Sequence, residues 1–272
     1  MPHTVLAVLM EQEGATACLD AAVLAAAVLP EGRVTALHVR LDPDSTIIPS
    51  EAVLTPKQRE ALALQAESEA AALHAVFAEW QAARRGTGCA AEWLDDAGRA
   101  GDVVARHGCD AALVAMAAPR PQARGPVQDA LHAALFDTHR LLLLVPHPGP
   151  VPPPRRIAIG WKDCTVCRKT IAEALPWLRA AQSVEVLHVV ARDAAELQAA
   201  DRLLRGHGIA ATLHALPRGE APVGRQLLEV AAQCADWLLI GAFRRPQAVE
   251  WLLGGVTRIV LQEARIPVLM GH

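Results

Sequence analysis

The sequence lacks the features that would direct it to a membrane, to nucleic acid or to secretion. Its longest apolar stretches, such as AAVLAAAVL at 21–29, are too short to span a bilayer. Its 26 Lys and Arg residues do not exceed its 29 Asp and Glu residues, so no basic field attracts nucleic acid. The first residues lack the basic start and cleavage site of a signal peptide. We therefore expect a cytoplasmic protein that binds neither nucleic acid nor membranes.

The sequence also lacks the short motifs that mark most catalytic and metal sites. We find no Walker lysine motif, nucleophile elbow, paired carboxylates or zinc-ligand spacing. The six cysteines are scattered through apolar segments, apart from Cys164 and Cys167, and we expect most of them to be buried thiols. These two form C-x-x-C at a helix start, where redox proteins lower a thiol pKa. The surrounding order of elements is unlike that of thioredoxin, so we expect no obligatory catalytic disulfide.

The 272-residue chain contains an internal repeat. VTALHV (34–39) resembles VEVLHV (184–189), HGCDAALVAM (107–116) resembles AQCADWLLIG (232–241), and HRLLLLVPH (139–147) resembles ARIPVLMGH (264–272). The second copy is shorter by about two dozen residues, which are lost between the first two of these segments. The first segments align His38 with His188, which we expect to be hydrogen-bonded structural residues within strands.

Each copy alternates apolar strands with helical patterns. Runs rich in Val, Ile and Leu that are separated by helices predict a parallel sheet covered on both faces. Helices are expected near 15–29, 55–85, 100–107 and 126–138 in the first copy, and over 166–180, 194–206, 222–234 and 254–264 in the second. The proline-rich stretch 148–154 predicts a stiff linker between a domain over 1–147 and another over 155–272.

Two stretches of the second copy follow strands at the edge where α/β sheets bind ligands. They are GWKDCTVC, after the first strand, and GAFRRPQAVEWLLGGVT (241–257), after the fourth. Gly254 and Gly255 open a helix whose free N–H groups can bind an anion. Equally, Gly241 can simply end a strand while the paired glycines pack a helix tightly on the sheet. In the first copy Ala115 aligns with Gly241, and Asp129 falls at the helix start, where it would repel phosphate.

With these motifs the chain resembles the universal stress protein family, in its tandem two-domain form, most specifically over 236–272. The resemblance implies a Rossmann-like α/β fold of two repeats, each an open five-stranded parallel sheet with helices on both faces. It also implies a pseudo-two-fold axis, with the last strands of the repeats paired. Members that bind ATP have a glycine pattern that Gly241 and Gly254 match, whereas Arg244 and Gly255 depart from it. Lys162 stands where the family tends to have an aspartate.

The resemblance implies a nucleotide site, for ATP or AMP, in the second repeat only. Its expected residues are Gly160, Lys162, Val190, Gly241, Arg244, Gly254, Gly255, Val256 and Thr257. Because two family contacts are altered, we expect an anion-binding helix start that binds ATP weakly or not at all. The function expected is that of a non-enzymatic stress-response factor, which pairs its own two repeats and can form a homodimer. The alternatives are a nucleotide-free protein-interaction module and, less favoured, a thiol redox protein.

Overall fold

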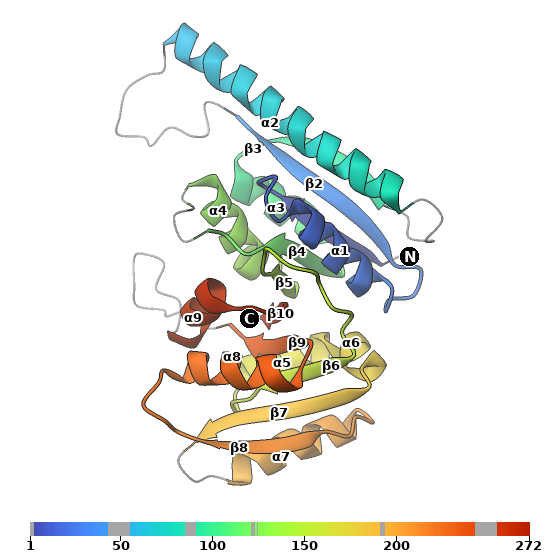
Figure 1. Ribbon diagram of the computed structural model, residues 1–272, viewed down its shortest axis with the longest axis vertical. Coiled ribbons are helices and arrows are strands. Elements are labelled where there is room, and N and C mark those ends of the chain that lie inside the picture. The colour runs from blue at the N-terminus through green and yellow to red at the C-terminus, as the bar shows by residue number, and fades with distance from the viewer. Residues whose placement is uncertain are drawn as a thin grey trace.

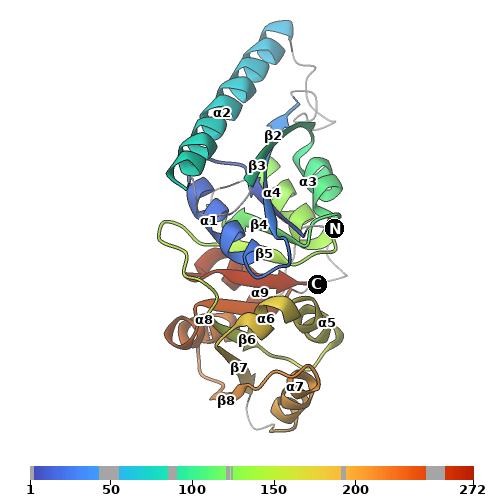
Figure 2. The same ribbon diagram turned by 90° about the vertical axis from the view of Figure 1, so that its right-hand side faces the viewer.

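The computed structural model describes residues 3–42, 55–84, 91–120, 123, 125–190, 194–242 and 255–272, without the side chains of 190 and 194. It contains one ten-stranded sheet with helices on both faces (Figure 1, Figure 2). In chain order the strands are β1 Thr4–Leu9, β2 Arg33–Leu41, β3 Ala91–Gly98, β4 Leu113–Ala117, β5 Leu142–Val145, β6 Arg156–Gly160, β7 Ser183–Val190, β8 Thr212–Pro217, β9 Trp237–Gly241 and β10 Val268–Gly271. The helices are α1 Ala15–Ala26, α2 Pro56–Ala83, α3 Ala100–Gly108, α4 Pro126–His132, α5 Thr165–Glu173, α6 Leu175–Ala180, α7 Ala194–Gly206, α8 Val223–Cys234 and α9 Gly255–Glu263, with a π-helical segment, η2 Ala133–Asp137, after α4.

The strand order confirms the predicted pair of five-stranded repeats. It runs β3-β2-β1-β4-β5-β10-β9-β6-β7-β8, and every pair within a repeat is parallel. The last strands of the repeats, β5 and β10, pair antiparallel, with Leu143 opposite Leu269. Equivalent strands that run in opposite directions are what a two-fold relation between the repeats requires. The pairing also covers an edge of each half-sheet that would otherwise have unpaired backbone groups.

Alternation along each strand divides the apolar side chains between the two faces of the sheet. In β1, Val5 and Leu9 point to one face and Leu6 and Val8 to the other. The first face is covered by α1, α2, α5, α6 and α7, and the second by α3, α4, α8 and α9. Both faces are therefore buried, as the continuous apolar strands predict. None of the described helices combines the length and apolar character that a membrane span needs.

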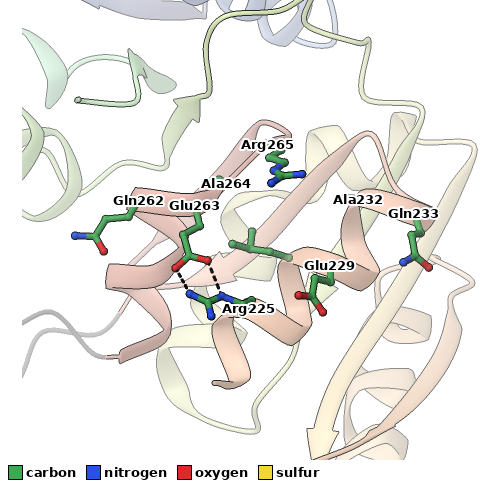
Figure 3. Close-up of a pocket in the computed structure, with 9 residues that line it drawn as sticks. Arg225, Glu229, Ala232, Gln233, Gln262, Glu263, Ala264 and Arg265 are labelled. Atoms are coloured by element: carbon green, nitrogen blue, oxygen red, sulfur yellow. Dashed lines mark hydrogen bonds and ion pairs between the residues drawn. The ribbon is translucent and has the colours of Figure 1, made fainter. Parts of the chain in front are cut away.

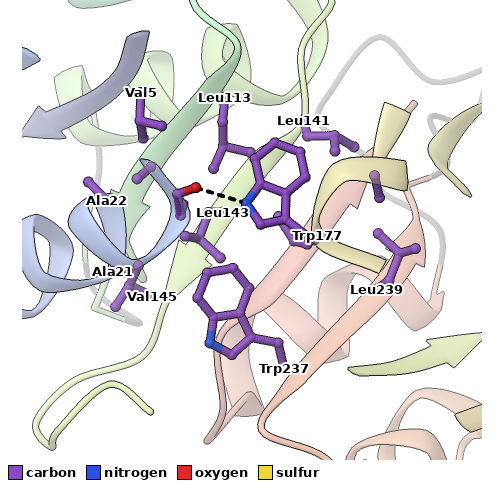
Figure 4. Packing of buried hydrophobic residues seen from close by; sticks show 14 of the residues in the cluster. Val5, Ala21, Ala22, Leu113, Leu141, Leu143, Val145, Trp177, Trp237 and Leu239 are labelled. Carbon is purple, nitrogen blue, oxygen red and sulfur yellow. Dashed lines mark hydrogen bonds between the residues drawn. The ribbon is translucent and has the colours of Figure 1, made fainter. Parts of the chain in front are cut away.

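The two repeats share a hydrophobic core. Trp177 of α6 is 1% exposed, and its indole N–H donates to the carbonyl oxygen of Ala25 in α1 at 3.1 Å (Figure 4). Trp237 of β9 is fully buried in the same cluster, and its indole N–H donates to the Pro152 carbonyl at 2.9 Å. The indole rings thus join the second repeat to the first and to the proline-rich segment between them.

The helices differ from the sequence predictions in two places. Residues 166–180 form two helices rather than one, because Pro176 has no N–H to donate and its ring clashes with the carbonyl four residues earlier. Residues 126–138 change from α-helix to π-helix after His132, and the Thr138 N–H donates to the Ala133 carbonyl five residues back. The predicted shortening of the second copy is confirmed, because α2 has 28 residues and α7, its counterpart, has 13.

Candidate functional site

A cavity of about 420 Å³ lies at the carboxyl ends of β6, β7 and β9, and we call it the switch-point cavity. The strand order reverses here, because β7 follows β6 on one side while β9 lies on the other. Open α/β sheets bind their ligands at such points, in pockets of ~300–1,000 Å³. Six of the residues expected from the sequence line the cavity: Gly160, Lys162, Gly241, Gly255, Val256 and Thr257.

The other three expected residues are not placed around the cavity. Val190 ends β7, and its side chain lies outside the described part of the chain, although its neighbour Val189 lines the cavity. Arg244 and Gly254 also lie outside the described residues. Their predicted roles stay predictions.

The glycines of the cavity are required for different reasons. A Cβ on Gly241 would come within 3.1 Å of both Cys167 Sγ and Val166 Cγ1, in the first turn of α5. Gly241 is therefore needed for the close packing of β9 against α5, a reason that the sequence did not indicate. A Cβ on Gly255 would meet no described atom within 4 Å, so the described part of the chain does not require a glycine there.

The first turn of α9 is held in place by α8. A Cβ on Gly224 would lie 3.2 Å from the Val256 Cα and 3.1 Å from the Ile259 Cβ, so the two helices approach closely here. Farther along, Arg225 donates two hydrogen bonds to the Glu263 carboxylate, at 2.8 and 2.7 Å (Figure 3). This guanidinium lowers the pKa of Glu263. A cleft of about 690 Å³ lies along this contact, and Figure 3 draws the residues that line it.

One side of the switch-point cavity offers donors to an anion. The first N–H groups of α9 have no partner within the helix, and they carry the positive end of its dipole. Lys162, which is exposed and follows β6, adds a positive charge. Thr257 lines the cavity but is fully buried. This arrangement suits a phosphate or a carboxylate.

Another part of the wall was not predicted as a site. His188 of β7 and Glu196 of α7 both line the cavity, with His188 Nε2 3.5 Å from Glu196 Oε2. Trp161 donates its indole N–H to the Glu196 backbone carbonyl at 2.9 Å. The sequence prediction of a hydrogen-bonded His188 is confirmed, because its Nδ1 lies 2.9 Å from the Trp161 carbonyl oxygen. Nothing in the local sequence near Glu196 indicates that α7 brings this carboxylate to β7.

The registers of the strands correct the sequence alignment of the two repeats. Val5 pairs with Leu113, and Ile157 pairs with Trp237. When the two repeats are aligned by these pairs, Ala117 is the residue equivalent to Gly241. The sequence alignment had placed Ala115 there, two residues earlier. The same count places Val8 at the position of Gly160 and Met10 at that of Lys162.

At two of these positions the first repeat has a larger side chain, Val8 for Gly160 and Ala117 for Gly241, and its cavity is nearly closed. The space lined by Val8, Met10, Met116 and Ala117 holds only about 10 Å³. Glu13, which also lines this space, forms an ion pair with Arg120. A volume of this size accommodates about one water molecule and no nucleotide. The small volume agrees with the expectation that the first repeat has lost its site, which stays a prediction.

The thiols beside the two cavities have the properties of buried structural groups. Burial raises the pKa of Cys167 to about 12, and burial likewise raises the pKa of Cys18, in the first repeat, to about 12. Cys164 begins α5, and its Sγ accepts a hydrogen bond from the Cys167 N–H at 3.5 Å. All cysteines in the described ranges are free thiols. Since a nucleophilic or redox-active cysteine needs a lowered pKa, these surroundings oppose the thiol redox alternative.

Within the described ranges, no group of three or more His, Cys, Asp and Glu side chains could hold a metal ion. Among the residues that the structure places there, the side chains with polar groups are those of Trp161, Lys162, Cys167, His188, Glu196 and Thr257, and the start of α9 adds backbone N–H groups.

Comparison with known proteins identifies the fold. No family model and no curated protein sequence matches the chain. A universal stress protein from Archaeoglobus fulgidus matches with a TM-score of 0.69 at 13% identity, over 98% of this chain and 97% of that one. A putative universal stress protein from Pseudomonas aeruginosa matches with a TM-score of 0.63 at 15% identity, over 99% of this chain and 93% of that one. The cytoplasmic domain of a prokaryotic cation chloride cotransporter matches with a TM-score of 0.53 at 12% identity, over 99% of this chain and 95% of that one. The chain therefore has the universal stress protein fold, in its two-repeat form.

Proposed function

We propose that this chain is a tandem universal stress protein, without enzymatic activity, that holds a nucleotide or a simpler phosphate-bearing anion in its second repeat. Its domains are the 1–147 and 155–272 segments, and its place of action is the cytoplasm. The observation that carries the proposal is the contrast between the cavities, about 420 Å³ in the second repeat and about 10 Å³ in the first. Because both repeats have the same fold, the first repeat shows how this site looks when side chains occupy the cavity.

The chemistry of the open cavity favours a phosphate group near α9. Backbone N–H groups at a helix start and a lysine ammonium both donate, and both favour negative charge. No described atom lies within 4 Å of a Cβ built on Gly255, so the described part of the chain allows a ligand to approach this backbone closely. Lys162 cannot accept hydrogen bonds from sugar hydroxyls, whereas an aspartate at this position could. Lys162 therefore favours contact with a phosphate group of the ligand over contact with its sugar.

Calorimetric titration with ATP, AMP and inorganic phosphate tests this function. We expect one ligand per chain, with an affinity that falls as salt concentration rises. The matched variant is Lys162→Met, because methionine is the residue that the first repeat has at this position. Removing the charge should weaken the binding of phosphate and of AMP about fivefold, which corresponds to ~1 kcal/mol for an exposed pair. Met10→Leu, in the closed cavity, is the control and should bind as the native chain does.

A nucleotide-free interaction module is the second candidate. The observation that favours it is the long helix α2, on which Leu64 is 60% exposed and Leu62 is 37% exposed. If none of the three ligands binds at millimolar concentration, the proposed ligand site is refuted and this second function takes its place.

A further inference from the structure

The two equivalent histidines leave one ring nitrogen each without a hydrogen bond. Nδ1 of His188 lies 2.9 Å from the Trp161 carbonyl oxygen, and Nδ1 of His38 lies 3.3 Å from the Leu9 carbonyl oxygen. Because a carbonyl can only accept, Nδ1 must have the proton, and Nε2 of the neutral ring is then an acceptor. Both Nε2 atoms are buried, and neither finds a hydrogen-bond partner among the described residues.

The surroundings of the two rings differ. His38 stacks on Trp93, with ring centroids 6.0 Å apart, and it is not among the residues that line the closed cavity. His188 is 4% exposed and lines the open switch-point cavity. The equivalent histidine therefore packs against a tryptophan ring in one repeat and lies in the wall of a cavity in the other.

Glu196 gives this space a second acceptor beside the first. Its Oε2 lies 3.5 Å from His188 Nε2 and accepts a hydrogen bond from the Asp163 N–H at 3.2 Å. Its backbone carbonyl accepts from the Trp161 indole, so the residue is held at both ends. When the ring has its single proton on Nδ1, neither Nε2 nor the carboxylate can donate to the other. A ligand that supplies donors would satisfy both.

We infer that His188 Nε2 and the Glu196 carboxylate bind two adjacent hydroxyl groups of the ligand, and that they select a phosphorylated sugar or nucleotide with a free vicinal diol. This inference rests on the proposed phosphate site, because the donors near α9 take the anion while this pair takes the sugar. Two neighbouring acceptors match two neighbouring hydroxyl donors. A ligand without the diol leaves a buried acceptor unpaired, which makes discrimination strong.

The test compares four ligands on the full chain by calorimetry: inorganic phosphate, ribose 5-phosphate, AMP and 2′,3′-dideoxy-AMP. We expect AMP to bind at least about tenfold more tightly than its dideoxy analogue, the factor expected for a hydrogen bond to a charged group. Glu196→Gln keeps an oxygen for the Asp163 N–H and loses the charge. This variant should bind AMP about tenfold more weakly than the native chain and should bind dideoxy-AMP equally well.

His188→Asn can still donate to the Trp161 carbonyl but has no Nε2, and it should abolish the preference for the diol. His38→Asn makes the same change in the first repeat and should leave all four affinities unchanged. Glu196 is partly exposed, so its variant keeps the test available if the buried histidine variant fails to fold.

The outcomes separate this inference from the function on which it rests. If AMP and dideoxy-AMP bind equally well, the diol site is refuted while the phosphate site stands. If ribose 5-phosphate binds more tightly than inorganic phosphate and AMP does not bind, the diol site stands and the nucleotide is excluded. If none of the four ligands binds, both are refuted. Unchanged AMP binding by Glu196→Gln overturns the assignment of that residue.

Discussion

Replacing Trp177 by alanine should weaken the junction between the two repeats. The side chain is 1% exposed, and its indole N–H donates to the Ala25 carbonyl across the interface. Truncating a buried tryptophan costs ~3–5 kcal/mol, and losing the hydrogen bond adds about 1 kcal/mol. The expected loss of about 5 kcal/mol is a large part of the ~5–15 kcal/mol by which a typical domain is stable.

Urea unfolding followed by circular dichroism measures this loss. The native chain should unfold in one transition, because both repeats share the core in which Trp177 lies. Trp177→Ala should lower the midpoint and separate the unfolding of the repeats. Trp177→Phe, which keeps a ring, should cost only a few kcal/mol. Trp80→Ala is the control, because this ring lies on α2 within the first repeat, 7% exposed. A loss below about 1.5 kcal/mol for Trp177→Ala, or two transitions in the native chain, would refute the shared core.

Three further predictions concern the second repeat. Gly241→Val should lower the free energy of unfolding in urea by ~1–3 kcal/mol, because the new side chain would overlap the first turn of α5. Gly255→Ala should change it by less than about 1 kcal/mol, and equal losses in the two variants would contradict the packing described. At pH 8 iodoacetamide should modify the exposed Cys109 and spare Cys167, as read by mass spectrometry, because burial raises the Cys167 pKa to about 12. Alkylation of folded Cys167 at pH 8 would contradict this burial. Since that folded pKa lies above the unfolded value of about 9, this thiol should not affect the free energy of unfolding below pH 9. The free energy of unfolding should then fall as the pH rises from 9 toward 12. Arg225→Ala should leave the urea midpoint nearly unchanged, because its pair with Glu263 is exposed. A large fall in that midpoint would mean that the pair determines the position of α9.

The sequence alone predicted apolar strands that alternate with helices, and the positions of nearly all of the helices. Continuous apolar runs such as LLLLV (141–145) and DWLLIG (236–241) can only be buried on both faces, so they predict a parallel sheet covered by helices. The internal repeat then fixes two copies of one topology. The helix boundaries that were predicted wrongly, at Ala174 and after His132, depend on a single proline and on a local change of hydrogen-bond spacing.

The edge of the sheet that holds the site was also predictable from the sequence. The carboxyl ends of β6 and β9 lie side by side in this topology, which brings Gly160, Lys162 and Gly241 together whatever the loops do. The reason that Gly241 is glycine was not predictable. Glycine there fits the packing of α5, a helix nearly eighty residues earlier in the chain.

Only the tertiary structure decided which cavity is open and what lines its far wall. The register of β4 on β1 moved the counterpart of Gly241 from Ala115 to Ala117, because a short sequence match does not fix strand pairing. Glu196 reaches His188 only because α7 packs back along β7, and a carboxylate on an exposed helix turn looks like any other in the sequence. Strand and helix patterns follow from local periodicity, whereas such pairs follow from how distant elements pack.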